Sequence, residues 1–388
     1  MTITDANTVL AAGRLVTGDD VLRPGWVEVA DGLVAAVGQG RPPRAADLDL
    51  ETATIVPGFV DMHVHGGGGC ALSDDSRASV QVAVDLHRRH GTTSMLASLV
   101  AAPPGELRRQ VARLAGLVGE GLVAGIHLEG PWLAPGRRGA HDITALRAPS
   151  TAEIDDLLAT GDGTIRMVTM APELPGALAA TRQLVAAGVA VAVGHTDASY
   201  EQAREAIDAG ATVATHLYNA MRPVHHRAPG PVIALMEDPR VTLEVITDGT
   251  HVHPALYRDV VARAGVDRVV LVTDAMAAAG MADGPYRLGS LAVEVLDGVA
   301  HLAGTDTIAG STATMDQLVR FAVANGGPDQ DQALLRAVRQ SSVTPARTLG
   351  LPAAGIEAGT AADLVVLDED LAVAGVMRRG AWVTSPDH

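Results

Sequence analysis

Histidine and carboxylate residues recur in this sequence at spacings that suit metal chemistry. His63-Val64-His65 places two imidazoles on one face of an extended strand, because side chains along a strand alternate in direction. Glu129, His195 and His216 add one hard oxygen ligand and two further imidazoles. A Glu–His–His set leaves a coordination position open for water, as a catalytic zinc-type site requires. These residues therefore predict a catalytic metal site.

Asp274, in the segment Thr273-Asp274-Ala275-Met276, is a candidate general base beside such a site. Two other interpretations are open. Asp274 could cap a helix that begins at Ala275, and the histidines and carboxylates together could form a buried ion-pair network. We favour the metal, because arginine partners are missing from the segments that carry these residues.

Composition excludes several other kinds of site. The 388 residues carry a formal net charge of −16, which disfavours a nucleic-acid or anionic membrane partner. The sequence has no lysine, so a Schiff-base lysine, a phosphate-loop lysine and a carboxylated lysine that bridges metals are all absent. Cys70 is the single cysteine against 14 histidines, which favours nitrogen and oxygen ligands over a cysteine-rich zinc module.

The elements that must position these residues alternate between strand and helix patterns. Eight buried strands are predicted, at Phe59–His65, Thr92–Ser98, Val123–Glu129, Thr164–Met170, Val189–His195, Thr212–Leu217, Thr242–Thr247 and Arg268–Asp274. Amphipathic helical patterns lie between most of them, for example at Ser76–His90, Glu106–Val118, Ser199–Ala209 and Pro254–Ala264. This order predicts an α/β fold, a (β/α)8 TIM-type barrel, with a doubly wound open sheet as the alternative.

The candidate ligands lie at the carboxyl ends of the predicted strands, where a (β/α)8 barrel has its active site. Both chain ends differ from this pattern. Short runs of alternating apolar and polar residues there predict a small β-sandwich domain. Asp31-Gly32 separates two of these runs, and this dipeptide is typical of a β-hairpin turn. We assign residues 1–56 and 353–388 to that domain and 57–352 to the barrel. Residues 284–310 are expected to insert as a hairpin before the last barrel helix.

Several segments, in order along the chain, resemble one known family. The opening Pro57–Gly66, which contains H-V-H, resembles the amidohydrolase superfamily. Within it, His127–Pro131 (H-L-E-G-P) and Thr215–Met221 (T-H-L-Y-N-A-M) are more discriminating. Together with Gly194–Thr196, Asp248–His251 and Thr273–Met276, they resemble the N-acetylglucosamine-6-phosphate deacetylases along the whole chain.

The resemblance implies a role for each matching residue. Glu129, His195 and His216 would hold the main metal, and His63 with His65 a second one, so one or two divalent metals per subunit are expected. Zn²⁺ is the first expectation, with Fe²⁺, Co²⁺ or Mn²⁺ as alternatives. Asp274 would take a proton from the metal water and later give it to the departing amine. His141 would polarise the acetyl carbonyl.

Substrate-binding residues are implied in the same way. Asn219, Ala220, Arg227 and His251 would bind the phosphorylated amino sugar, and Arg227 would reach the active site of the neighbouring subunit in a homodimer. The implied reaction is hydrolysis of the acetamide of N-acetyl-D-glucosamine 6-phosphate. The segment 131–141 is expected to close over the substrate.

Two other functions stay open. The chain could act on another N-acyl amino-sugar phosphate or on a cyclic amide, or it could be an inactive barrel that serves as a scaffold or sugar-binding module. No secretory signal is visible in Met1–Leu10, and no apolar run of about 18 residues suggests a membrane helix, so the expected location is cytoplasmic.

Overall fold

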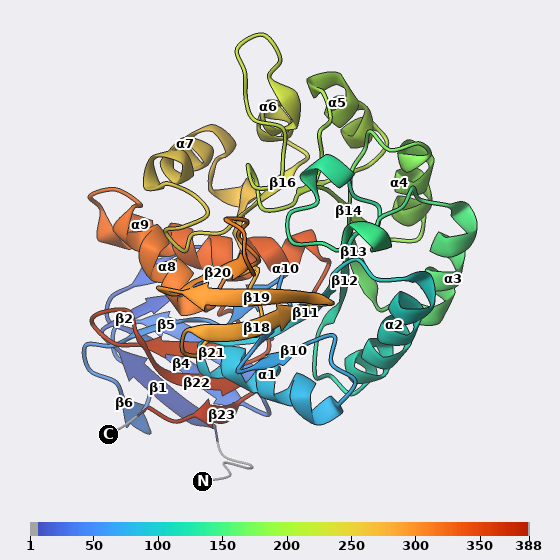
Figure 1. Ribbon diagram of the computed structural model, residues 1–388. Coiled ribbons are helices and arrows are strands. Elements are labelled where there is room, and N and C mark those ends of the chain that lie inside the picture. The colour runs from blue at the N-terminus through green and yellow to red at the C-terminus, as the bar shows by residue number, and fades with distance from the viewer. Residues whose placement is uncertain (1–6, 387–388) are drawn as a thin grey trace. The chain divides into compact units, whose positions relative to one another are not determined.

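Eight strands in chain order form the central sheet of the structure, a computed structural model that describes residues 7–386 (Figure 1). They are β8 (Phe59–Asp61), β11 (Thr92–Leu99), β12 (Gly125–Glu129), β13 (Ile165–Met170), β14 (Ala190–Val193), β15 (Val213–Ala214), β16 (Thr242–Val245) and β17 (Val269–Leu271). Every predicted strand is confirmed, although five of the eight end two to four residues earlier than expected.

Hydrogen bonds beyond the ends of β17 and β8 join the last strand to the first. The amide of Asp274 donates to the carbonyl oxygen of His63 at 2.8 Å, and the amide of His65 donates to that of Ala275 at 2.7 Å. A doubly wound sheet would reverse its strand order at a switch point, whereas this order is sequential. The predicted TIM-type barrel is therefore confirmed and the open-sheet alternative is wrong.

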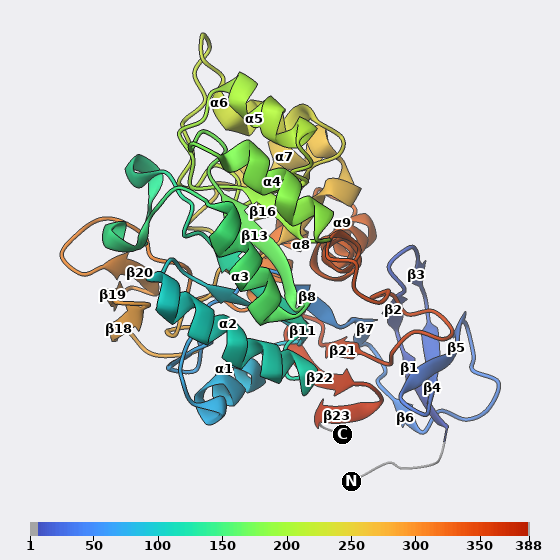
Figure 2. The ribbon, with the colours of Figure 1, turned by 90° about the vertical axis from the view of Figure 1, so that its right-hand side faces the viewer.

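Helices lie between the strands of the barrel and after the last of them along the chain. They are α1 (Arg77–Arg89), α2 (Pro104–Gly119), α3 (Thr151–Gly161), α4 (Ala177–Ala186), α5 (Tyr200–Asp208), α6 (Gly230–Glu237), α7 (Pro254–Ala264), α8 (Met315–Ala324), α9 (Gln330–Val338) and α10 (Thr344–Thr348). Helices α2 to α5 lie side by side in Figure 2. In α2, Leu107, Val111 and Leu114 recur at helical spacing and are buried, which gives this helix its inward face.

The strands from the two chain ends form two further sheets. Their strands are β1 (Thr8–Ala12), β2 (Arg14–Val16), β3 (Val21–Leu22), β4 (Gly25–Ala30), β5 (Leu33–Gln39), β6 (Leu48–Asp49), β7 (Thr54–Pro57), β21 (Leu364–Leu367), β22 (Val373–Arg378) and β23 (Ala381–Thr384). One sheet has the order β5-β4-β1-β6 and the other β23-β22-β21-β7-β2-β3. Leu10 and Val27 of the first and Ile55 and Leu364 of the second share one core, which confirms the sandwich from both termini.

The hairpin predicted at Asp31-Gly32 joins β4 and β5, which pair antiparallel. Asp31 has a φ of 50° and Gly32 a φ of 77°, the left-handed pair that a tight two-residue turn requires. Within the described residues, 7–61, 85–94 and 315–386 form one compact unit, and Met62–Val84 with Met95–Thr314 forms the other. The division at 56/57 and 352/353 stays a prediction.

The insertion after β17 is a three-stranded antiparallel sheet rather than a simple hairpin. Its strands are β18 (Gly284–Leu288), β19 (Leu291–Leu296) and β20 (Val299–Leu302). Val293, Val295 and Ala300 pack with Met276 and Ala309 in a small core of their own. This core ties the insertion to the segment that follows Asp274. Two short strands, β9 (Gly66–Gly67) and β10 (Cys70–Ala71), pair just after His65.

Within residues 7–386, no helix is both long enough and apolar enough to cross a membrane. Part of Met1–Leu10, where no secretory signal was expected, lies outside the described residues.

Candidate active site

The residues singled out at the strand ends come together in one place. Seven of them are at most 8% exposed, namely His63, His65, Glu129, His141, His195, His216 and Asp274. They come from the segments after β8, β14, β15 and β17, from the end of β12, and from the loop after β12. Parallel strands bring their carboxyl ends to the same rim of a barrel, so residues far apart in sequence meet there.

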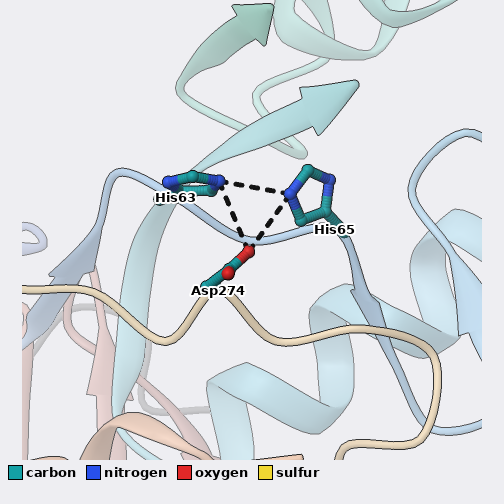
Figure 3. Close-up of side chains that lie close together, drawn as sticks. All are labelled: His63, His65 and Asp274. Atoms are coloured by element: carbon teal, nitrogen blue, oxygen red, sulfur yellow. Dashed lines mark hydrogen bonds and ion pairs between the residues drawn. The ribbon is translucent and has the colours of Figure 1, made fainter. Parts of the chain in front are cut away.

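His63, His65 and Asp274 form the first group that could hold a metal ion (Figure 3). Nε2 of His65 lies 3.2 Å from Oδ1 of Asp274 and 3.2 Å from Nε2 of His63. Nε2 of His63 lies 3.4 Å from the same Asp274 oxygen. Figure 3 shows the two rings and the carboxylate pointing toward one another.

Glu129 stands between this group and a second one. Its Oε1 lies 2.9 Å from Nε2 of His195 and 3.1 Å from Nε2 of His216, and those two nitrogens are 3.1 Å apart. Its Oε2 lies 3.2 Å from Nε2 of His65 and 3.2 Å from Nε2 of His141. Glu129, His141 and His195 form the second group of possible ligands. One carboxylate thus offers an oxygen to both groups.

The hydrogen bonds at Nδ1 fix how three of the rings present Nε2. Nδ1 of His63 faces Oε2 of Glu244 at 3.1 Å, and Nδ1 of His65 faces the carbonyl oxygen of Ser98 at 3.2 Å. Nδ1 of His195 faces the carbonyl oxygen of Arg137 at 2.9 Å. A carbonyl or ionised carboxylate only accepts, so each Nδ1 carries the donated proton and each neutral ring has its lone pair at Nε2.

Converging lone pairs and carboxylates require positive charge between them. Burial alone would lower the pKa of His65, but its hydrogen bonds to Asp274 and Glu129 outweigh it and raise the pKa to about 9. Burial likewise opposes the charge on His63, yet Glu129, Asp274 and Glu244 raise its pKa well above the usual value. A divalent cation supplies the same charge and suits these nitrogen and oxygen donors, so the residues fit a metal centre.

The carboxylates respond in the opposite direction. Burial would raise the pKa of Asp274, but the neighbouring imidazoles of His63 and His65 lower it to about 2. Burial would also raise the pKa of Glu129, and His63, His141 and His195 hold it well below the usual value. Both groups are therefore ionised at neutral pH.

His141 presents its ring differently from the other histidines. The backbone amide of Ala101 donates to its Nδ1 at 3.2 Å, so that nitrogen holds the lone pair and the proton is on Nε2. This Nε2–H donates toward Oε2 of Glu129. By distance His141 belongs to the second group, but it offers a hydrogen-bond donor rather than a lone pair. His216 is as close to this group, with its Nε2 3.1 Å from both Glu129 and His195.

Three of the buried polar residues adopt a backbone conformation that costs energy. The φ angles of His195, His216 and Asp274 are 47°, 25° and 47°, in the left-handed region that residues with a Cβ rarely enter. Strain of this kind concentrates at functional sites. Before His195, a Cβ on Gly194 would lie 2.6 Å from Cβ of Thr215, so only glycine fits there.

Except for His63, the seven buried residues line a cavity of about 390 Å³, within the size range of small-molecule sites. Asn219, Ala220 and His251 line it, as does much of the 136–141 segment. Burial would lower the pKa of His251, but its hydrogen bond to Asp248, 2.7 Å from Nδ1 to Oδ2, raises it. The amide of Asn219 already donates to the carbonyl oxygen of His216, so it is used within its own turn.

Arg227 is not brought to this cavity. It lies in an exposed stretch, 223–228, and its Nη1 is 2.7 Å from Nε2 of His226. This stretch belongs to the loop that extends beyond α6 in both ribbon views (Figures 1 and 2). The expected contact with a neighbouring subunit's site stays a prediction.

One interpretation from the sequence is wrong. Asp274 does not cap a helix, because Ala275 pairs as a β-bridge with Val64 and with Ser311. In the described part of the chain, the next helix after Asp274 is α8, at Met315.

Several residues of the site were not identified from the sequence. Glu244, fully buried in β16, contacts His63 and the amide of His216. It could have been identified from the sequence, since it is the one charged residue in the predicted apolar strand Thr242–Thr247. Leu288, Thr307 and Ile308 of the insertion also line the cavity. No local sequence pattern predicts that these residues lie close to the strand ends.

A buried hydrogen-bonded chain lies next to the side chains of the candidate site. Oγ of Ser98 is 2.9 Å from Nδ1 of His127, Nε2 of His127 is 2.9 Å from Oγ1 of Thr169, and that oxygen is 2.8 Å from Oγ1 of Thr215. Burial and the neighbouring His63 hold the pKa of His127 well below its usual value. His127 is therefore neutral, and it joins Ser98 to Thr169 by hydrogen bonds in the barrel interior.

Comparisons with known proteins agree with this arrangement. An N-acetyl-D-glucosamine-6-phosphate deacetylase variant from Mycobacterium smegmatis, solved in complex with N-acetyl-D-glucosamine-6-phosphate, is 58% identical, with a TM-score of 0.97 over 98% of this chain and 100% of that one. The N-acetylgalactosamine-6-phosphate deacetylase of Escherichia coli O157:H7 is 38% identical over 96% of this chain and 98% of its own length. The N-acetylglucosamine-6-phosphate deacetylase of Vibrio furnissii is 36% identical over 92% and 90%.

The profile of the amidohydrolase family matches residues 54–383, which include the whole barrel and most of the C-terminal strands. The barrel, the buried histidines and carboxylates at its strand ends, and this match agree with the resemblance seen in the sequence. The chain belongs to the amidohydrolase family.

Proposed function

We propose that this chain hydrolyses the acetamide of N-acetyl-D-glucosamine 6-phosphate to D-glucosamine 6-phosphate and acetate. The observation that carries the proposal is the 58% identity, over nearly the whole of both chains, to a deacetylase solved with this substrate. The buried donor cluster at the floor of a cavity of suitable size supports it. A homodimer in the cytoplasm, and the residue roles given next, are part of the proposal.

Glu129, His195 and His216 would hold one divalent metal, and His63 with His65 a second, Zn²⁺ being the first candidate. When bound, such a cation acts as a Lewis acid that makes water a better nucleophile near neutral pH and polarises a carbonyl oxygen. The Nδ1 hydrogen bonds of His63, His65 and His195 support this assignment, because they leave Nε2 as the ligand atom.

Asp274 would be the general base and then the general acid. Its Oδ1 lies at the cavity floor within 3.4 Å of both His63 and His65, where a water molecule that attacks the acetyl carbon would meet it. The carboxylate takes one proton as the C–O bond forms. It returns that proton to the amide nitrogen as the C–N bond breaks, so that the amine leaves neutral and acetic acid remains, which loses its own proton to water and becomes acetate.

His141 would bind the oxygen of the acetyl group. Its Nε2–H points at the same part of the cavity as the Glu129 carboxylate, and a donor aimed at the developing oxyanion lowers the barrier. His251, Asn219 and Ala220 would position the sugar phosphate from the cavity wall. Arg227, exposed on its loop, would supply cationic charge to the phosphate in the neighbouring subunit, with charge-assisted hydrogen bonds.

A second candidate substrate is the epimer that the relative from Escherichia coli O157:H7 is named for, N-acetylgalactosamine 6-phosphate. The two sugars share the acetamide and the phosphate and differ in one hydroxyl configuration, so the proposed chemistry is the same for both. A cyclic amide would use the same donors but would lack the phosphate that Arg227 is proposed to bind.

The test is acetate release by the purified protein from four sugars, the glucosamine and galactosamine derivatives each with and without the 6-phosphate, before and after chelation. Chelator-sensitive release that strongly prefers a phosphorylated sugar is expected, with the glucosamine form first. Release at equal rates with and without phosphate would overturn the phosphate role. No release from any of the four, by protein that carries metal, would overturn the proposed reaction.

A further inference from the structure

We propose that Glu244 is a positioning residue that holds the two ligand groups of the metal centre in register. The inference rests on the proposed function only in its assumption that His63 and His216 bind metal. Glu244 lies inside β16 with no exposed surface. Unlike Asp274 and Glu129, it is not among the residues that line the cavity, so it acts through other residues.

The first contact is with the first ligand group. Oε2 of Glu244 accepts a hydrogen bond from Nδ1 of His63 at 3.1 Å. This bond fixes the tautomer of His63 and orients its ring, so that Nε2 faces His65 and Asp274. His65 receives its own support separately, from the carbonyl oxygen of Ser98. The His63 ring therefore depends on Glu244 in a way that His65 does not.

The second contact is with His216, one of the three residues proposed to hold the main metal. The same Oε2 accepts the backbone amide of His216 at 3.1 Å, and the carbonyl oxygen of Glu244 accepts the amide of Leu217 at 2.8 Å. His216 has a φ of 25°, a conformation that needs outside support. Nδ1 of its ring has no hydrogen-bond partner among residues 7–386, so, apart from the contacts of Nε2 inside the site, His216 is held through its backbone.

One oxygen of Glu244 thus ties together two ligands that are separated by 153 residues. If Glu244 acts by positioning these two residues, a side chain of the same length must present the accepting oxygen, and the negative charge of the carboxylate matters less. The other oxygen, Oε1, has no partner within the described structure. An amide nitrogen could therefore take the place of Oε1 while the amide oxygen keeps both hydrogen bonds.

Two variants separate position from charge. Glu244→Gln keeps the reach and removes the charge, whereas Glu244→Asp keeps the charge and shortens the side chain by one methylene. The same two substitutions at Glu294, exposed on β19, are the matched controls. Metal-free protein is titrated with Zn²⁺ against a chromophoric chelator, without substrate, to give the number of ions bound and their dissociation constants. Circular dichroism of the metal-free forms checks folding.

We expect Glu244→Asp to weaken binding of at least one ion by about 10- to 100-fold, the usual effect of losing a residue that orients a ligand. Glu244→Gln is expected to bind metal nearly as the parent does, and both Glu294 variants fully so. In turnover, Glu244→Asp should lower kcat with KM unchanged, because the cavity wall is intact. Unchanged Zn²⁺ binding in Glu244→Asp would overturn the proposal, and so would equal losses in the Asp and Gln variants. Because the titration needs no substrate, a wrong substrate assignment would not affect it.

Discussion

The backbone amide of Ala101 donates to Nδ1 of His141 at 3.2 Å, which places the imidazole proton on Nε2. His63, His65 and His195 have the opposite arrangement, with an acceptor at Nδ1. A single backbone contact thus distinguishes a histidine that donates into the cavity from histidines that offer a lone pair there. This difference supports the proposal that His141 binds the acetyl oxygen and that the other three histidines hold metal.

We expect His141→Ala to lower kcat by about 10²- to 10³-fold, the usual cost of losing one donor to a developing oxyanion. Metal content should be unchanged, since the ring does not present a lone pair to the site. Acetate release and elemental analysis on the same protein sample measure both. His216→Ala is the comparison, and it should lose metal. A loss of metal in His141→Ala as large as in His216→Ala would show that His141 is a ligand.

Asp274→Asn should lower turnover by about 10²- to 10⁴-fold, because an amide cannot accept the proton that general-base catalysis transfers. Its side chain keeps the size of the original, and Glu129, His195 and His216 are untouched, so the ion held by those three residues should remain. Single-turnover acetate release and metal analysis make the measurement. Substantial activity in this variant would remove Asp274 from the mechanism.

The barrel could be predicted because its determinants are local. Each buried strand is a short apolar run, and the order of strands and helices along the chain gives the topology. The polar residues of the candidate site could also be located in the sequence, since His195, His216 and Asp274 interrupt apolar runs at the strand ends. The strands themselves end earlier, because the left-handed backbone of these three residues breaks the ladder.

What could not be predicted depends on contacts between distant segments. The bond from His63 to Glu244 joins residues 181 apart, and the bond from Ala101 to His141 joins two loops. The third strand of the insertion packs with Met276 and Ala309, and Thr307 and Ile308 line the cavity, but no local pattern predicts either contact. Sequence periodicity carries no information about such pairs.

Removing the metal should both abolish activity and destabilise the fold. The proposed ligands are buried carboxylates and imidazoles, so the folded state should bind the cation and the unfolded state should not. Adding Zn²⁺ back to a free concentration about 100 times its dissociation constant should raise the free energy of unfolding by about 2.7 kcal/mol for each site filled. Thermal unfolding of metal-free protein at increasing Zn²⁺ measures this, with Mg²⁺, which prefers all-oxygen ligands, as the control. A Tm that does not respond to Zn²⁺ would contradict the metal centre.

Arg227→Ala should raise KM for the phosphorylated sugar and leave kcat nearly unchanged. The reason is that Arg227 lies outside the cavity and is proposed to meet the phosphate, which is remote from the bond that breaks. Loss of one charged hydrogen bond is worth about 1.5–3 kcal/mol, or roughly 10- to 150-fold in KM. The unphosphorylated sugar should show almost no change, and Arg258→Ala, on α7, is the control for loss of an arginine.

Whether Arg227 acts in its own subunit or in the neighbour can be decided by mixing two defective variants. In a mixed dimer, the Arg227→Ala chain keeps Asp274, and the Asp274→Asn chain keeps Arg227. If Arg227 reaches across, the site of the first chain receives its arginine from the second, and one site per mixed dimer regains the normal KM. If Arg227 serves its own chain, every site in the mixture lacks either the base or the arginine, and mixing restores nothing. The two variants are unfolded and refolded together, and acetate release at low concentrations of the phosphorylated sugar is compared with that of each variant refolded alone. Recovered activity with the parental KM would establish that each active site needs a second copy of the chain, which the exposure of the 223–228 stretch leads us to expect.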